Sequence, residues 1–204
     1  MTRKNSRFRF TALLALACAT LLAGCAGSKI PTVYYSLYAP TVQGAGAPVT
    51  DDDISVSVGP VTIPDILKQT RIATGGENGS YDLAEYHRWS GDVDRDLARA
   101  LAEHLARKLG TQRVSVFPWD QDFTPTYQVM VDVLFMGGAP GKEAMLSARW
   151  TIMDKAGQGG AITRRIDLRM PPTGPDLSSW VAAQQRNVEK LGVAIAETIT
   201  EARK

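Results

Sequence analysis

The segment YQVMVDVLFMGGAPGKEAMLSARWTIMD (residues 127–154) decides the fold class. Apolar side chains occupy every second position of its first part: Tyr127, Val129, Val131, Val133 and Phe135. This alternation predicts a strand that buries one face. The run 137–141 is rich in glycine and predicts a turn, after which residues 144–154 alternate in the same way. A second glycine-rich turn precedes another predicted strand over 161–168, so the three strands should form an antiparallel meander.

Two long helices are predicted on either side of this meander. Over residues 92–109 apolar side chains recur at helical spacing, and Gly110 follows as a stop signal. The same spacing recurs from about Asp176 to Ala202, with Asp176 as the expected N-cap. We therefore expect an α+β fold, in which a mainly antiparallel sheet packs against two amphipathic helices in one domain over residues 33–204.

Earlier strands are predicted over residues 33–38 and 54–58, and a hairpin over 71–89. Pro60 and Pro64 follow the second of these strands. Because proline has no backbone N–H to donate, this segment is predicted to be an edge strand or a bulged strand.

The N-terminus has the features of a secretory signal. Residues 1–9 contain four basic residues and no acid, and residues 10–23 are mostly apolar. At about 1.5 Å per residue this apolar run is roughly 21 Å long as a helix, too short for a hydrocarbon core of about 30 Å. The sequence Leu22-Ala23-Gly24-Cys25 follows and resembles the bacterial lipobox. We expect residues 1–24 to be a lipoprotein signal peptide, Cys25 to be the lipid attachment site, and residues 25–32 to be an acylated tether.

Composition excludes several functions for the remaining chain. The sequence has 23 basic and 21 acidic residues, and removal of residues 1–24 takes away four basic residues, which leaves 19 against 21. This balance gives no basic surface for nucleic acid. Cys18 leaves with the signal peptide and Cys25 is acylated, so no disulfide is expected. His87 and His104 lack metal-ligand spacing and no nucleophile motif is present, so we expect no metal, no cofactor, no catalytic residue and no enzyme activity.

Seven motifs occur in the order seen in a known family. They are YYSLYAP, VGPVTIPDIL, HRWSGDVDRDLARALAEHLARKLG, VSVFPW, YQVMVDVLFM, LSARWTIMD and WVAAQQRNVEKLGVAIAETI. Together they resemble the PqiC/YmbA-like lipoproteins, which are auxiliary components of ABC-type transport systems. The chain departs from the family pattern at residues 66–71 and 90–92, so its partner surface is expected to differ there.

The resemblance implies an outer-membrane lipoprotein that faces the periplasm and works with an MCE-type lipid-transport protein to maintain envelope integrity. Ala26, rather than aspartate, follows Cys25, which favours sorting to the outer membrane. Acyl chains such as palmitate would hold the protein to the membrane, while its body docks the transport conduit. The candidate contacts with that partner are Tyr34, Tyr35, Pro60, Pro64 and Trp119.

Other interpretations stay open at this point. Tyr34 and Tyr35 alternate across a strand, so one should be buried and the other free. The prolines could simply protect a strand edge, and Trp119 could be a core residue. The chain could instead be a periplasmic lipid carrier with an apolar cavity of about 300–1,000 Å³, or an assembly chaperone for an outer-membrane complex. A homo-oligomer would suit a symmetric conduit, but these residues do not establish one.

Overall fold

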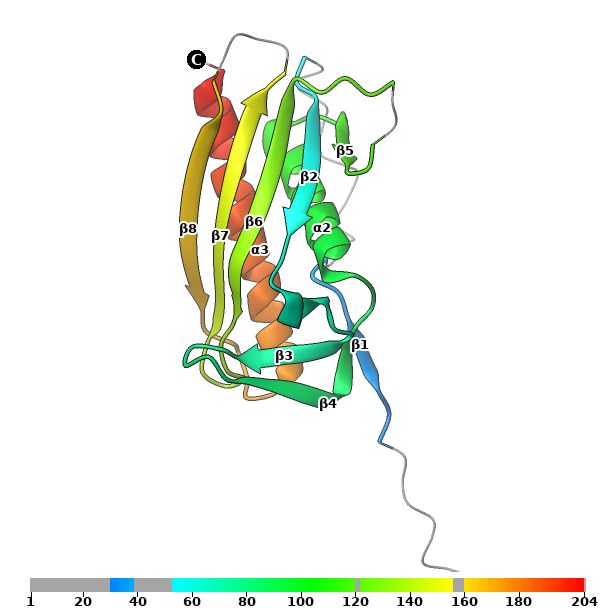
Figure 1. Cartoon of the computed structure of the whole chain (residues 1–204), viewed down its shortest axis with the longest axis vertical. Helices are drawn as coiled ribbons and strands as arrows, with labels where there is room; N and C mark the ends of the chain where they lie inside the picture. Colours follow the sequence, from blue (N-terminus) through cyan, green and yellow to red (C-terminus); the bar gives the residue numbers. More distant parts are fainter. Residues whose placement is uncertain (1–29, 39–52, 120–121, 156–159, 204) are drawn as a thin grey trace, which may run out of the picture. The chain divides into compact units, whose positions relative to one another are not determined.

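A five-stranded sheet and two helices form the body of the protein in a computed structural model, which describes residues 30–38, 53–119, 122–155 and 160–203 (Figure 1). These elements belong to one compact unit, Thr32–Lys204. The order of the strands in the sheet is β5-β2-β6-β7-β8. The strands are β2 (Val56–Thr62), β5 (Val114–Val116), β6 (Tyr127–Gly137), β7 (Ala144–Asp154) and β8 (Ile162–Met170).

Both helices lie on the same face of this sheet (Figure 1). α2 (Val93–Leu109) contacts β2 and β5, and α3 (Leu177–Ala202) contacts β7 and β8. The α+β class and the two amphipathic helices are therefore confirmed. The predicted signal peptide 1–24 and Cys25 lie outside the described residues.

A second sheet of three strands has the order β1-β4-β3. It contains β1 (Val33–Tyr35), β3 (Arg71–Gly75) and β4 (Tyr81–Trp89), and a 3-10 turn η2 (Asp65–Lys68) precedes β3. The antiparallel pairing of β3 and β4 confirms the predicted hairpin. A bridge between Gly75 and Gly138 joins the end of this hairpin to the end of β6.

The sheets are more mixed than the sequence predicts. The meander β6-β7-β8 is antiparallel as expected, but β2 runs parallel to both β5 and β6, and β1 runs parallel to β4. The prediction of a mainly antiparallel sheet needs this correction. A parallel pair needs a long crossover connection, and the chain between β2 and β5 supplies one that includes α2. Alternation reports which face of a strand is buried and not the direction of its neighbour.

β2 is bulged at Pro60, whereas Pro64 lies beyond the end of the strand. The register between β2 and β6 shifts between Val58 and Val61, which confirms the predicted bulge around Pro60. The predicted edge also fits the segment with Pro60, because β5 flanks β2 only at residues 56–58. β5 ends at Val116, so beyond Val58 the strand is paired on the β6 side only, and Pro60 lies in that half.

β6 contains a second irregularity that the alternation does not reveal. Its register with β7 shifts between Val133 and Phe135. Beyond the shift Met136 is the buried residue, at 1% exposed, and Phe135 is only half-buried. The assignment of Phe135 to the buried row is therefore wrong, because one extra residue reverses the faces of all that follow.

Gly110 ends α2 and Asp176 begins α3, as the sequence predicts. Gly110 closes α2 in a left-handed conformation, with its N–H donating to the Ala106 carbonyl. At the start of α3 the Asp176 carboxylate accepts a hydrogen bond of 2.9 Å from the Ser179 N–H. Hydrogen bonds from Ser178 and Ser179 hold the pKa of Asp176 well below its usual range. The N-cap predicted for α3 is confirmed.

The N-terminal strand is fixed to both helices just after β1. Asp96 of α2 accepts hydrogen bonds from the Ser36 hydroxyl, at 2.8 and 2.9 Å to its two oxygens, and from the Leu37 N–H at 2.5 Å. The Gln185 amide of α3 donates to the Ser36 carbonyl at 2.8 Å. Leu37 is itself in the core, at 2% exposed. We call Ser36, Leu37, Asp96 and Gln185 the N-terminal clasp.

The β8 edge of the five-stranded sheet carries a charged residue on its core-facing row. Ile162 and Ile166 of β8 pair with residues of β7 that face the helices, and Arg164 lies between them opposite the buried Trp150. Arg164 is nevertheless exposed. β8 is the outermost strand on that side of the sheet in Figure 1.

The two helices approach closely at Gly192. A methyl group on Gly192 would lie 2.7 Å from the His104 Cβ on α2, closer than two carbons can pack. Replacing Gly192 by alanine gains about 1 kcal/mol of helix propensity but costs about 1–3 kcal/mol of overpacking. We therefore expect Gly192→Ala to lower the free energy of unfolding by about 1 kcal/mol in urea denaturation. A stability gain would show that the helices can move apart without cost.

Candidate partner-binding surface

A surface groove lies between the bulged half of β2, the end of β5 and the first turns of α2. Its volume is about 200 Å³. Pro60, Phe117 and Pro118 line one side, and Asp94, Arg95 and Ala98 of α2 line the other. Pairing of β2 with β5 ends at Val58 and Val116, and the groove lies beside the part of β2 that follows.

Phe117 is the most prominent apolar side chain beside this groove. It is 51% exposed, and its ring meets the Trp119 ring edge-on with centroids 5.4 Å apart. We call Pro60, Phe117, Pro118 and Trp119 the aromatic–proline patch. Large apolar and aromatic side chains that remain exposed on a folded domain mark interaction sites.

Gly59 allows Phe117 to pack closely against β2, beside Pro60. Its φ of +124° is a conformation that L side chains rarely adopt, and an added Cβ would lie 2.6 Å from the Phe117 Cβ. The Phe117 N–H donates to the Val58 carbonyl at 2.9 Å, which fixes the backbone of the patch against β2. The patch is therefore held on a strand and not on a loop alone.

Of the five partner contacts predicted from the sequence, the structure places only two in the aromatic–proline patch. Pro60 and Trp119 both belong to the patch, and Trp119 is half-buried. Pro64 is half-buried at the start of η2, where its carbonyl accepts from the Leu67 N–H at 2.9 Å. Tyr34 and Tyr35 lie on β1 in the other sheet.

The two tyrosines divide as the alternation predicts. Tyr34 is 64% exposed. Tyr35 is half-buried, and its hydroxyl lies 2.9 Å from His87 Nδ1. Burial is the main cause of a raised pKa for Tyr35. Tyr34 is free as predicted, whereas Tyr35 is half-buried and not fully buried.

Phe117 is the member of the patch that the sequence interpretation missed. It lies in an apolar run, VSVFPW, and apolar runs of this kind usually predict a buried strand. The following proline was the available signal, since it ends the strand and frees the preceding side chain from the buried row. The α2 side of the groove had no signal in the sequence, because only the fold brings Asp94 and Arg95 beside β2.

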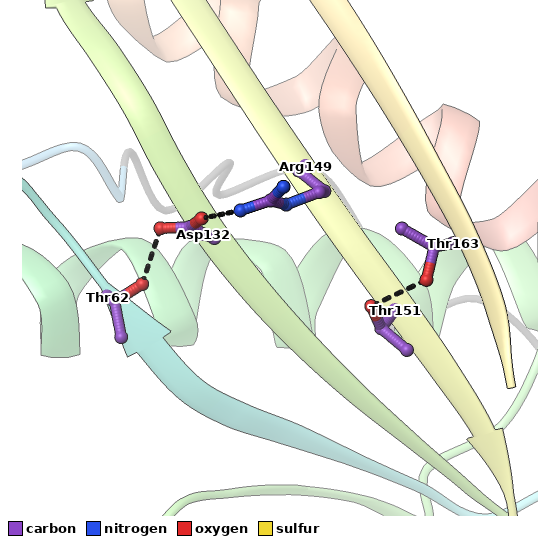
Figure 2. A network of polar contacts seen from close by, with 5 residues as sticks. All are labelled: Thr62, Asp132, Arg149, Thr151 and Thr163. Atoms are coloured by element: carbon purple, nitrogen blue, oxygen red, sulfur yellow. Dashed lines mark hydrogen bonds and ion pairs between the residues drawn. The ribbon is translucent and has the colours of Figure 1, made fainter.

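The sheet face opposite the helices is a second uncovered surface, but its charges are already satisfied. Figure 2 shows Asp132 accepting from the Thr62 hydroxyl at 2.7 Å and from Arg149 at 2.6 Å, beside a contact of 3.0 Å between Thr151 and Thr163. The hydrogen bonds from Thr62 and then Arg149 hold the pKa of Asp132 below its usual range.

Two further arginines of this face are engaged in the same way. Arg165 lies 3.0 Å from Asp167, and Arg169 lies 3.0 Å from Glu143. This face is therefore polar and internally paired, and the aromatic–proline patch is the better candidate for a partner.

Other hollows around α2 and α3 are small and open to the surface. One between His104, Lys108 and Glu189 measures about 290 Å³, and one beside Tyr127 and Ala202 measures about 190 Å³. These volumes lie below the range expected for a lipid carrier. Burial lowers the pKa of His104, and Arg107 lowers it further.

Within the described ranges, no group of three or more His, Cys, Asp or Glu side chains is placed to hold a metal ion. Among the helices of the described part of the chain, none combines the length and apolar character needed to cross a membrane.

Comparison with solved structures supports the fold. An uncharacterised protein of known crystal structure aligns over 83% of this chain and 99% of its own, with 20% identity and a TM-score of 0.65. A protein from Xanthomonas campestris aligns over 84% of this chain and 96% of its own, with 12% identity and a TM-score of 0.65. At these identities the likeness concerns the fold alone. No curated protein matches the chain.

Comparison with protein families gives a specific result. The family model described as "ABC-type transport auxiliary lipoprotein component" matches residues 35–196. The match spans every described element from β2 to β8 and most of α3, and it confirms the family resemblance drawn from the seven motifs. This is a family of transport auxiliary components and not a known enzyme family. The chain belongs to the ABC-type transport auxiliary lipoprotein family.

Proposed function

We propose that this protein is a periplasmic lipoprotein of the outer membrane, anchored through acyl chains on Cys25, that docks the conduit of an MCE-type lipid-transport system and so helps to maintain the envelope. Residues 1–24 would be the signal peptide, 25–32 the tether and 33–204 the docking domain. The family match supports the coarser part of this proposal, a lipoprotein that assists transport.

Phe117 is the observation that carries the docking proposal. It is 51% exposed beside a groove of about 200 Å³, in contact with Trp119, on a strand-supported patch. Such a pairing of a protruding aromatic side chain with an adjacent groove is typical of the centre of a protein interface. Pro60 and Trp119 belong to the proposed contact, and Pro64, Tyr34 and Tyr35 stay predictions.

The test is the affinity between the detergent-extracted lipoprotein and its purified MCE-type partner. We expect Phe117→Ser to weaken binding about 30-fold, because loss of a central aromatic side chain costs about 2 kcal/mol or more. Leu134→Ser is the matched control, since Leu134 is also a large apolar residue, 37% exposed, but lies on β6 and does not line the groove. Equal affinity of the wild type and Phe117→Ser would contradict docking through this patch.

A further inference from the structure

Exposed apolar side chains concentrate next to the proposed anchor. Five large apolar residues of the described chain are exposed, and three of them fall within residues 30–34: Ile30, Val33 and Tyr34. Nine positions separate Cys25 from Tyr34. At about 3.5 Å per residue, Tyr34 can lie no more than roughly 30 Å from the acylated cysteine.

The sheet register places two arginines beside Tyr34. Tyr34 of β1 pairs with Arg88 of β4, and Arg88 pairs in turn with Arg71 of β3. Residues paired across adjacent strands lie on the same face of a sheet. The next row, Tyr35 and Trp89, faces the core, since Trp89 is 4% exposed, so the row of Tyr34, Arg88 and Arg71 faces away from it. We call these three residues the Tyr–Arg row.

Neither arginine has an acidic partner in the part of the chain that the structure describes. Among the described residues, neither guanidinium forms an ion pair, and the Arg88 side chain makes only a long contact of 3.4 Å to the Glu85 carbonyl. Arg71 is exposed and Arg88 is half-buried. Like charges directly opposite each other on neighbouring strands destabilise a sheet. An external anion placed over the row would remove that cost.

We infer that the Tyr–Arg row docks on the surface of the bilayer that holds the lipid anchor, with the two arginines on anionic headgroups and Tyr34 at the interface. This inference rests on the proposed acylation of Cys25. Tyrosine is enriched at the boundary between apolar and aqueous layers, and exposed arginines are attracted to anionic lipids. The contact would make the anchored domain lie with its three-stranded sheet toward the membrane, and leave the aromatic–proline patch on the other sheet for the partner.

The test places a nitrobenzoxadiazole label at a single thiol and measures its quenching by nitroxide-labelled lipid. In the mature protein Cys18 is removed and Cys25 is blocked, so a cysteine introduced by Tyr34→Cys is the one free thiol. The acylated full-length product is reconstituted into phosphatidylcholine vesicles with about one quarter phosphatidylglycerol, and into pure phosphatidylcholine. The control is Leu134→Cys on β6, which has similar apolar character and belongs to the other sheet.

We expect strong quenching at position 34 in anionic vesicles and little at position 134. Combining the label with Arg71→Gln and Arg88→Gln should weaken the docking equilibrium roughly 5-fold for each arginine removed. Arg165→Gln with Arg169→Gln removes the same charge from paired arginines of the other sheet and should change nothing. Thermal unfolding of each variant verifies that it is folded.

Equal quenching at positions 34 and 134 would overturn the inference. So would quenching at position 34 that is the same in anionic and neutral vesicles and is unchanged by Arg71→Gln and Arg88→Gln. Failure of the proposed function has a different signature, because the intact mass of the same preparation reports whether Cys25 carries acyl chains. An acylated protein without quenching at position 34 rejects only the Tyr–Arg row.

Discussion

Replacement of Cys25 by alanine is expected to abolish the membrane-bound mature form of this protein. The wild type should be recovered with the membrane, without residues 1–24 and with the added mass of its acyl chains. Each buried CH₂ group contributes about 0.8 kcal/mol, so several acyl chains hold a protein where one chain exchanges. Without the thiol there is no site for the first acyl transfer, and the variant should appear only as an unacylated species, released or still carrying its signal peptide.

Cell fractionation combined with intact-mass measurement checks this expectation. Cys18→Ala is the matched control, because it makes the same change of side chain within the apolar run and should leave the acylated form unchanged. A wild-type protein with an unmodified Cys25 thiol, or a Cys25→Ala variant that keeps the full acyl mass, would contradict the assignment of the anchor.

Loss of the Asp96 carboxylate is expected to cause the largest loss of stability among changes outside the apolar core. Asp96 holds the N-terminal clasp through the Ser36 hydroxyl and the Leu37 N–H. Hydrogen bonds to a charged group contribute about 1.5–3 kcal/mol each, and the variant also leaves the Leu37 N–H without its acceptor. We expect Asp96→Ala to lower the free energy of unfolding by about 2–4 kcal/mol.

Denaturant titration measures this loss, and hydrogen exchange should show faster exchange in residues 33–37 than in the rest of the chain. Asp94→Ala is the control, since both acids lie in the first turn of α2 and favour its positive end equally. Asp94 lines the groove and does not reach Ser36 or Leu37. If the two variants lose the same stability, the helix dipole and not the clasp explains the effect.

The elements with strong periodicity could be predicted from the sequence almost to the residue. The apolar spacing over residues 92–109 predicted α2, and the apolar spacing after the Asp176 cap predicted α3. Both signals are local features of the sequence. The meander followed from alternation and glycine-rich turns. The parallel neighbours of β2 could not be predicted in this way, since they depend on a crossover through α2 that no local pattern encodes.

The candidate site was predictable only in part, for related reasons. Pro60 and Trp119 stand out by residue type, but their proximity to Phe117 depends on the pairing of β2 with β5 and on Gly59. The reversal of faces near Phe135 comes from one inserted residue in β6, which leaves the composition of the strand unchanged. Arg71 and Arg88 are 17 positions apart in the sequence. Whether they pair depends on the register between β3 and β4, which a single sequence does not specify.

Arg164 on the core-facing row of β8 has a consequence for crowding on a membrane. Proteins confined to a surface meet one another far more often than in free solution, and an open strand edge invites copies to join into continuous fibrils. Joining through β8 would force the Arg164 guanidinium out of water against the apolar side chains of a neighbour. On a membrane that held the proposed anchor, this charge would therefore disfavour joining of copies through the β8 edge.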